Sequence, residues 1–592
     1  MSITTDNAPA VVSETSPSSL PSKTDMTSST SEDSDPPAQT GSAPGRREIL
    51  YITGPRFYLI VFAVSTSLFL TNFEIPVVTT SLVPISSSLG HLSLSAWVLA
   101  SYLLGYVSFL IIFAKLSDIF GRKQIFLLCL LLFTIFSAGC GAAQTMKQLI
   151  VLRAFQGFSG GGCFSVPLTM SLEMVPKEKF AGLTAFLSAV MAVSMIAGPV
   201  VGGAISGRGE QGGGWRWVFL LNVPAAIPVL GVIVWVIPRG FPYHNLAMDK
   251  AADDGERQKK GDRLQSVKGI FTKERIQRVD FFGGGLLLVS TLAMVAAFEE
   301  AGLDFGWNSA FVITLLCVSV VVWAAFIFWE RRVTLRYKSG TSATEPVFPW
   351  HFFTDRVWLG MSLASLSLGA VWVAGVYQLP QRFMVLHGLP PLDAGIRVMA
   401  YTGVAPISSI LTAGIAKKGV PPIYIVLFVS CLQVIGFALL GSLSTSTDDI
   451  RTIGSAQYGY QVIAGFGCGS NISLLGLMTP FSVKEKDLAV AMGAITQVRI
   501  MGSALGVSIV TTAMHTFLRG ELGHLGLGQD VIDSVLDSAG EIGRLGSEEL
   551  QNDVLRSFAD GYNLQMRILA GLAAGQIFGA ALMWKHGKQI KV

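Results

Sequence analysis

Charged side chains are scarce in this sequence. Asp, Glu, Lys and Arg make up 14% of the 592 residues, whereas a soluble chain of this size carries about a quarter. Hydrophobic residues reach 51%, and the mean hydropathy is +0.54. The formal net charge of +4 is too small to favour binding to a nucleic acid. The composition therefore predicts a protein of the lipid bilayer and gives no support to a nucleic-acid partner.

Cysteine is also sparse, and its pattern excludes two kinds of site. All six cysteines fall inside apolar runs, and no two of them have the spacing of a CxxC motif. Neither a disulfide framework nor a structural metal site is expected from such a pattern. We expect no metal and no cofactor.

An ATP-binding loop is missing, although two stretches are rich in glycine. Gly157–Gly162 and Gly465–Gly469 lie within apolar runs that no strand precedes. We interpret them as helix-packing glycines rather than phosphate-binding loops. Any transport by this chain must then be driven by an ion gradient. A His-box and an aspartyl dyad are also missing, which argues against a membrane enzyme.

The first 50 residues have almost no large apolar side chains and are rich in Ser, Thr, Pro and Asp. Such a segment buries too little apolar surface to offset the entropy that it would lose on ordering. It has no basic region followed by an apolar one, so a cleaved signal peptide is not expected. Residues 1–50 are therefore predicted to form a disordered cytosolic tail.

From Arg56 onward, apolar windows recur that are long enough to cross about 30 Å of hydrocarbon, which takes about 20 helical residues. They predict an all-α polytopic membrane protein with fourteen spans. Six spans form a first bundle at 57–237, a charged cytosolic loop follows at 238–279, two inserted spans lie at 280–330, and six spans form a second bundle at 357–585. The predicted spans are Phe57–Leu82, Trp97–Phe113, Gln124–Ala142, Gln148–Leu172, Ala181–Ile205, Trp217–Ile237, Phe281–Phe298, Ala310–Trp329, Trp358–Gln378, Gly395–Ile415, Pro422–Leu440, Tyr458–Pro480, Leu488–Phe517 and Asn563–Trp584. The outer segment Gln529–Phe558 has apolar pairs at helical spacing and is interpreted as an interfacial helix.

Lysine and arginine cluster in alternate loops, and this asymmetry predicts the orientation. The short loop Ala114–Lys123 carries three basic residues, whereas Ser86–Ser95 carries none and the charges of Glu299–Ser309 are all acidic. Basic loops remain in the cytosol, so both termini are predicted to be cytosolic. The other basic positions of the inner loops are Lys177, Lys179, the cluster Arg239–Arg278, Arg331, Arg332, Arg336, Lys338, Lys417, Lys418, Lys484, Lys486, Lys585, Lys588 and Lys591.

An internal repeat is suggested by glycine spacing. Gly198 and Gly202 stand four apart in the fifth span, and Gly502 and Gly506 do so in the thirteenth, which holds the same place in the last six. Two related bundles around a central cavity are the architecture of many secondary transporters.

Five motifs, in order, make up a resemblance to a known family. AKLSDIFGRK (Ala114–Lys123) resembles the signature loop of the major facilitator superfamily, LRAFQGFSGGG (Leu152–Gly162) its fourth-span motif, and AGPVVGG (Ala197–Gly203) its fifth-span antiporter motif. Asn72–Gly90 and Gly214–Pro224 are similar to segments of the fourteen-span drug:proton antiporters, particularly fungal ones. The likeness covers about Tyr58 to Trp584 and implies a proton-coupled exporter of drugs or secondary metabolites.

The sequence departs from the family pattern in several places. Ala114 replaces the usual first glycine of the loop motif, and Ala185 and Ser194 stand where glycines are more usual. Glu74 takes a place where many relatives have aspartate and so keeps the carboxylate. The corresponding loop of the second half, Gly414–Gly419, has no acidic residue.

Glu74, Arg153 and Arg499 lie well inside predicted spans, where a charge is costly unless paired or hydrated. Glu74 is the candidate proton-coupling carboxylate, because buried carboxylates can exchange protons near neutral pH; the alternative is a structural, hydrated glutamate. The free-energy cost of an arginine inside the membrane and the family resemblance together favour a functional role for Arg153, as a cation that tunes the proton site or faces the cavity. The alternative is a snorkelling arginine. Arg499 could meet an anionic substrate group, pair with Glu74, or bond to neighbouring carbonyls.

Two groups of residues are expected to control conformational change. The resemblance implies that Asp118, Gly121, Arg122 and Glu173 form a charge relay, or latch, that stabilises the outward-facing state; anchoring of the loop in headgroups is the alternative. In the antiporter motif, proline removes a backbone hydrogen bond and small residues permit close helix approach. A kink is therefore predicted at Gly198, Pro199, Gly202 and Gly203.

A polar lining of the cavity is expected from Gln156, Asn222, Tyr377, Gln378, Gln461, Asn471, Gln497 and Arg499. Few charges among apolar and aromatic neighbours suit a medium-sized, mostly apolar small-molecule substrate. The sequence thus predicts a monomeric exporter in the plasma membrane, with a vacuolar or vesicular membrane as the alternative place. An uptake carrier, for example for a siderophore chelate, and a non-transporting membrane sensor are the alternative functions.

Overall fold

The computed structural model describes residues 51–79, 81–89, 95–206, 214–238, 241, 272–301, 305–445, 452–484, 487–537, 542, 543, 545 and 547–584. The chain divides into Met1–Glu48 and Ile49–Val592, and every described residue belongs to the second unit. The predicted tail at 1–50, residues 239, 240 and 242–271 of the predicted loop 238–279, and the basic residues after Trp584 lie outside the described residues.

Within these ranges fourteen helical segments are long and apolar enough to cross a membrane, which confirms the predicted all-α fold and its span count. The chain is an integral, multi-pass membrane protein. The spanning helices are α1 (Pro55–Thr79), α3 (Ser95–Phe120), α4 (Arg122–Ala142), α5 (Met146–Glu173), α6 (Phe180–Ser206), α7 with α8 (Arg216–Leu220 and Asn222–Trp235), α12 (Phe281–Glu300), α13 (Ala310–Lys338), α15 (Arg356–His387), α16, α17 and α18 (Pro391–Arg397, Met399–Thr402 and Val404–Lys417), α19 (Pro422–Leu440), α21 (Ala456–Ser482), α22 (Leu488–His524) and α24 (Glu548–Met583). Shorter helices are α2 (Leu82–Leu89), η2 (Lys177–Lys179), α11 (Lys273–Gln277), α14 (His351–Thr354) and α23 (Gln529–Asp537).

Local sequence explains where several helices begin and end. Gly121 separates α3 from α4 with a φ of 105°, a left-handed conformation that glycine adopts without strain. The hydroxyl of Thr145 accepts a hydrogen bond from the Gln148 N–H at the start of α5, and α15 ends at Gly388 with a φ of 63°. These caps satisfy backbone groups that a helix end leaves unpaired.

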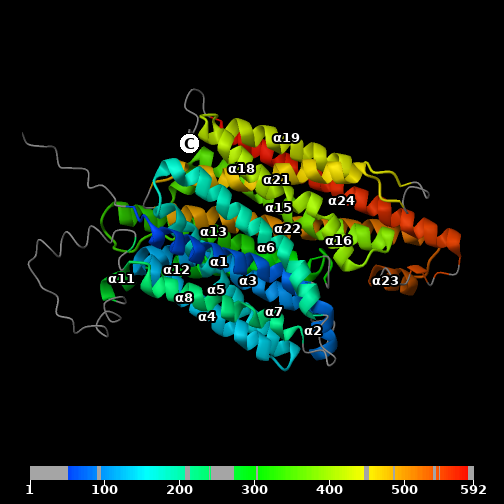
Figure 1. Ribbon diagram of the computed structural model, residues 1–592, viewed down its shortest axis with the longest axis horizontal. Helices are drawn as coiled ribbons and strands as arrows, with labels where there is room; N and C mark the ends of the chain where they lie inside the picture. Colours follow the sequence, from blue (N-terminus) through cyan, green and yellow to red (C-terminus); the bar gives the residue numbers. More distant parts are fainter. Residues whose placement is uncertain are drawn as a thin grey trace, which may run out of the picture. The chain divides into compact units, whose positions relative to one another are not determined.

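The helices pack as two groups that meet along a few pairs. α3 packs on α5 and α1 on α6 in the first half, while α15 packs on α22 and α24 in the second. The halves meet where α6 contacts α18 and α3 contacts α22, and the inserted α12 packs against both α3 and α22. In Figure 1, α11 lies at the left end of the helices, whereas α2, α16 and α23 lie at the right end. We call the end at α11 the basic end. The turn from α3 to α4, with Arg122 and its partner Glu173, belongs to it, because Lys115 of α3 and Arg278 next to α11 both pair with Glu345.

A pair of tyrosine–glycine contacts extends the repeat suggested by the sequence. A Cβ added at Gly157 would lie 2.1 Å from the carbonyl oxygen of Tyr102, and one added at Gly465 would lie 2.1 Å from that of Tyr401. In the first half, the second span therefore crosses the fourth at this contact. In the second half, the tenth span crosses the twelfth in the same way. Counting back equally from each glycine, Arg153 corresponds to Gln461.

The outer ends of the last two spans differ from the prediction. α22 continues to His524 and α24 begins at Glu548, so the last part of Gln529–Phe558, from Glu548 on, belongs to a spanning helix rather than to an interfacial one. The remaining short helix, α23, buries Ile532 and Val535 against Leu518 and Phe558 of its neighbours. Hydropathy underestimates the length of such helices, because their ends are polar and extend beyond the hydrocarbon.

Close packing of α15 on α22 depends on glycine and leads to a prediction. A Cβ added at Gly502 would lie 1.9 Å from the Leu366 carbonyl oxygen, a backbone atom that cannot move aside easily, whereas Gly520 of the same helix has nothing within 4 Å. We expect Gly502→Ala to destabilise the protein by about 1–3 kcal/mol and Gly520→Ala to be neutral or slightly stabilising. Thermal unfolding of the two purified variants in detergent measures this, and equal unfolding temperatures would contradict the prediction.

Candidate functional site

Glu74 of α1 and Arg153 of α5 form an ion pair inside the first bundle. Both side chains are fully buried, and Arg153 Nη1 lies 2.5 Å from Glu74 Oε1. The sequence singled out both residues but did not pair them. The alternative in which Glu74 pairs with Arg499 is wrong for this conformation, because the partner of Glu74 comes from its own bundle.

Amide side chains complete the coordination of the Glu74 carboxylate. Gln156 Nε2 donates to Glu74 Oε1 over 3.0 Å and to Ser137 Oγ over 2.7 Å, and its Oε1 accepts from Arg153 Nη1 over 2.9 Å. Asn222 Nδ2 donates to Glu74 Oε2 over 2.7 Å and contacts Ser137 Oγ at 3.3 Å. Four helices, α1, α4, α5 and α8, thus contribute to one hydrogen-bonded cluster, which we call the carboxylate cluster (Glu74, Ser137, Arg153, Gln156 and Asn222).

The guanidinium of Arg153 is held by further contacts. Its Nε donates to the Val98 carbonyl oxygen over 3.0 Å, and its carbon lies 4.3 Å from the centroid of the Tyr102 ring and 5.5 Å from that of Phe219. Its Nη2 is buried without a hydrogen-bond partner among the described residues. An arginine is tolerated in an apolar bundle when it is paired in this way, so Arg153 is not a snorkelling residue.

A cavity of about 740 Å³ lies between the two halves of the protein. Its walls include Tyr106 and Phe164 from the first half and Trp372, Gln378 and Arg499 from the second. It extends towards the end opposite the basic end, where Thr79, Leu82, Val535 and Phe558 line it. A cavity of this size matches that of a drug-sized ligand.

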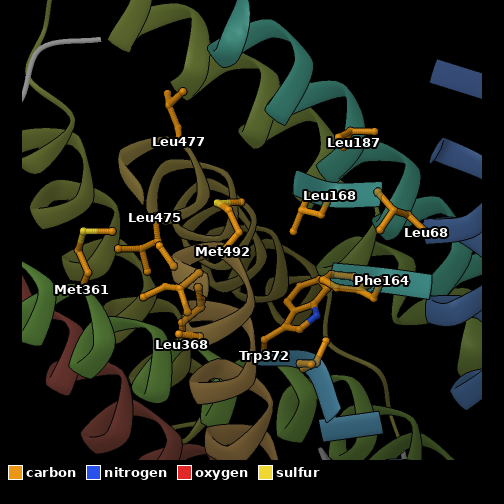
Figure 2. Packing of buried hydrophobic residues seen from close by; sticks show 14 of the residues in the cluster. Leu68, Phe164, Leu168, Leu187, Met361, Leu368, Trp372, Leu475, Leu477 and Met492 are labelled. Carbon is orange, nitrogen blue, oxygen red and sulfur yellow. The ribbon is translucent and has the colours of Figure 1, made fainter. Parts of the chain in front are cut away.

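The cavity is closed towards the basic end by packed apolar side chains. Phe164, Leu168 and Leu187 of the first half and Leu368, Leu475 and Met492 of the second surround a residual void of only about 30 Å³. Figure 2 shows these side chains, with Trp372 beside them, converging from helices of both halves. Further along, the Phe180 and Phe481 rings meet at 5.8 Å between centroids.

The residues expected to line the cavity occupy three different places. Tyr377, Gln378 and Arg499 line it. Gln156 and Asn222 lie in the carboxylate cluster. The others, Gln461, Asn471 and Gln497, are buried between helices. Successive residues of a helix point about 100° apart, so membership of a span does not decide which side chains face the cavity.

The second bundle contains a neutral counterpart of the carboxylate cluster. Asn471 Nδ2 donates to Gln576 Oε1 over 2.6 Å and to Ser430 Oγ over 3.0 Å. Gln461, at the position corresponding to Arg153, has no hydrogen-bond partner for either amide atom among the described residues. Gln497 instead donates to Thr291 of the inserted α12 over 3.1 Å. Within the described part of the chain, the buried carboxylate–arginine pair therefore belongs to the first bundle only.

The latch residues come together at the basic end. Arg122 pairs with Asp118 and, over 2.7 Å from its Nη2, with Glu173 Oε1; its Nη1 donates to Ser117 Oγ over 2.7 Å. Gly121 supplies the turn that places Arg122 there. Among described residues no ion pair includes Lys417 or Lys418, in keeping with the missing acid of the corresponding loop.

The signature loop also contacts the segment that leads into the second bundle, which the sequence did not indicate. Lys115 Nζ lies 2.7 Å from Glu345 Oε2, and Arg278 Nη2 lies 2.6 Å from Glu345 Oε1. Partial burial alone would raise the pKa of Glu345, but its two cationic neighbours hold that pKa below its usual value. Glu345 therefore remains ionised and links both basic side chains.

The antiporter motif lies in α6 where this helix packs on α1. Gly198, Pro199, Gly202 and Gly203 are all within α6, which continues through Pro199 to Ser206. A Cβ added at Gly198 would lie 2.5 Å from Cγ of Pro76 in α1. The motif thus permits close approach of the two helices, one of which carries Glu74; a kink at Pro199 stays a prediction.

Comparison with known proteins gives consistent results. A family model described as Major Facilitator Superfamily matches residues 58–304. The chain is 34% identical over 538 residues to the MFS-type transporter FPY5 of Fusarium mangiferae, covering 91% of this chain and 85% of that one. It is 26% identical to the MFS-type efflux pump LUC4 of Fusarium sp, covering 94% and 88%, and 26% identical to Multidrug resistance protein 3 of Bacillus subtilis, covering 76% and 78%.

Solved structures support the fold. The proton:xylose symporter XylE superposes with a TM-score of 0.54 at 13% identity, covering 90% of this chain and 97% of that one. A bacterial homologue of the lysosomal transporter Spinster gives a TM-score of 0.52 at 17% identity, covering 90% and 100%.

Proposed function

The chain belongs to the major facilitator superfamily, and we propose that it is a secondary transporter that exports hydrophobic small molecules, such as drugs or secondary metabolites, in exchange for protons. Relatives named as efflux pumps support the direction of transport. The observation that carries proton exchange is the fully buried Glu74–Arg153 pair beside the cavity.

The position of Glu74 suggests how its protonation affects the substrate cavity. Thr71, Asn72 and Ile75 line the cavity, while Glu74 on the same turns of α1 points into the carboxylate cluster. A proton on Glu74 would remove its charge and so its attraction to Arg153, and would alter the hydrogen bonds of Gln156 and Asn222. Because these residues lie on different helices, protonation would change how α1 packs within the bundle and hence the shape of the cavity wall.

Alternating access would require the closed end and the open end of the molecule to exchange states. The latch and the apolar packing close the basic end, and the cavity extends towards the other. With the basic end in the cytosol, as the loop charges predict, this arrangement is an outward-facing state. Opening the basic end requires separation of the Phe180–Phe481 contact and loss of the latch, after which substrate could enter from the cytosol.

Reconstitution tests this function. In proteoliposomes with an imposed pH gradient, we expect a lipophilic fluorescent probe to move in the direction opposite to protons, and a protonophore to abolish that movement. Suitable probes are pyrenebutyrate and its neutral amide, pyrenebutanamide, with protein-free liposomes correcting for passive distribution of the acid. Movement of probe and protons in the same direction would instead indicate an uptake carrier. If the flux of both probes equalled that of protein-free liposomes, the transport proposal would be contradicted.

A further inference from the structure

Arg499 of α22 is a half-buried cation without a counter-ion among the described residues. It lines both the cavity and the small void below it. Among the residues that the structure describes, none forms a hydrogen bond or an ion pair with its guanidinium. Tyr106 of the first half lines the same cavity.

The fully or nearly fully buried arginines Arg122, Arg153 and Arg382 each have a hydrogen-bond acceptor among the described residues. Arg153 is paired with Glu74, Arg122 with Asp118 and Glu173, and Arg382 donates to Asn563 Oδ1 over 2.8 Å. A charge at membrane depth is costly unless it is paired or hydrated. The free guanidinium of Arg499 is therefore a feature that a bound ligand would stabilise.

The rest of the lining favours an anion next to an apolar body. Among the described lining residues there is no Asp or Glu, so no protein carboxylate competes for Arg499. The rings of Tyr106, Phe164 and Trp372 line the same part of the cavity, and flat or aromatic ligands stack well on such rings.

The backbone of Arg499 is held in place, which gives its side chain a defined origin. A Cβ added at Gly369 of α15 would lie 1.7 Å from the Arg499 carbonyl oxygen, so the two helices touch at this residue. A side chain anchored at a helix contact loses less freedom on binding a ligand than one on a loop.

From this geometry we propose that the cavity takes lipophilic weak acids as their anions, with Arg499 as the counter-ion of a carboxylate or enolate and the apolar body between the aromatic rings. The inference rests on the proposed transport function and names its substrate class. A guanidinium presents a planar fork of N–H donors that can bind two oxygens of one anionic group. A neutral or cationic substrate would leave the charge of Arg499 unbalanced.

A matched pair of ligands tests this. Binding of pyrenebutyrate and pyrenebutanamide to the purified protein in nanodiscs is measured by quenching of tryptophan fluorescence, at a pH where the acid is ionised. The natural protein should bind the carboxylate at least about tenfold more tightly than the amide, as expected for a charge-assisted hydrogen bond. Arg499→Gln should abolish this preference by weakening carboxylate binding alone, and Arg499→Lys should retain part of it.

A matched variant and a separate readout keep the interpretation clear. Arg382→Gln removes another buried arginine, outside the cavity lining, and should leave the preference unchanged. Equal affinity of the natural protein for both probes, or an unchanged preference in Arg499→Gln, would overturn the proposal. Proton-coupled flux of pyrenebutanamide in the reconstituted system would still support the transport function in that case. Thermal unfolding should show that Arg499→Gln folds, and with improved stability, since an uncompensated charge has been removed.

Discussion

Arg153→Met is expected to destabilise the protein by about 3–5 kcal/mol, the usual effect of removing one partner of a buried ion pair. The substitution leaves the Glu74 carboxylate inside the bundle with only the amides of Gln156 and Asn222 as donors. It also removes the hydrogen bond to Val98 and the contact with the Tyr102 ring. Thermal unfolding of the purified protein in detergent would show this as a drop in the unfolding temperature.

A double substitution separates the charge effect from simple loss of packing. In Glu74→Gln/Arg153→Met no charge is left uncompensated, so the double variant should be more stable than Arg153→Met alone. Lys147→Met, at an exposed position of the same helix, is the matched control and should have little effect. If the double variant were as unstable as Arg153→Met, or less stable, the ion pair would not be the source of the loss.

The substitutions at Glu74 and Arg153 should affect transport differently from stability. Glu74→Gln keeps the shape and most hydrogen bonds of the side chain but cannot exchange a proton, so gradient-driven flux should vanish in the single and double variants alike. Probe binding should persist, because Glu74 does not line the cavity. Proton-driven flux of Glu74→Gln at the level of the natural protein would exclude Glu74 as the coupling residue.

Removal of the latch is the second change with a large expected effect. Arg122→Ala removes the partner of Asp118 and Glu173 and leaves two buried or half-buried carboxylates facing each other. Loss of such a pair is expected to shift the balance between closed and open basic ends by at least about tenfold. The basic end should therefore open more often, and export should fall because the outward-facing state is less populated.

Cysteine labelling measures this opening. Leu475 is buried where the basic end is closed, so in Leu475→Cys a polar maleimide applied from that side should react slowly. Adding Arg122→Ala should speed the reaction at least about tenfold, whereas Lys179→Ala, an exposed basic residue nearby, should not change it. Equal labelling rates in the two backgrounds would show that the Arg122 contacts do not hold the basic end shut.

The span count was predictable because a membrane helix carries its own signal in hydropathy. Pro422–Leu440 begins and ends in the structure where the sequence predicted. The predicted ends came too early at α3, α13, α15 and α22, and the predicted start of α24 came too late. These helices continue beyond the hydrocarbon, where hydropathy no longer reports on helix length. Motif residues such as Asp118, Arg122 and Glu173 could likewise be singled out, because each stands at a recognisable position in a short pattern.

Sequence alone therefore determined the class of protein, the number and approximate positions of its spans, and three of the charges that lie inside them; it missed Arg382 and Glu330, which are buried within α15 and α13. Tertiary structure alone decided the partners of those charges. Glu74 lies 79 residues from Arg153 and 148 from Asn222, and nothing in their local sequence indicates that they touch. Arg153 and Arg499 look alike as lone arginines in apolar helices. One is paired and the other faces the cavity, because helix rotation and packing, which depend on every neighbouring helix, set the direction of each side chain.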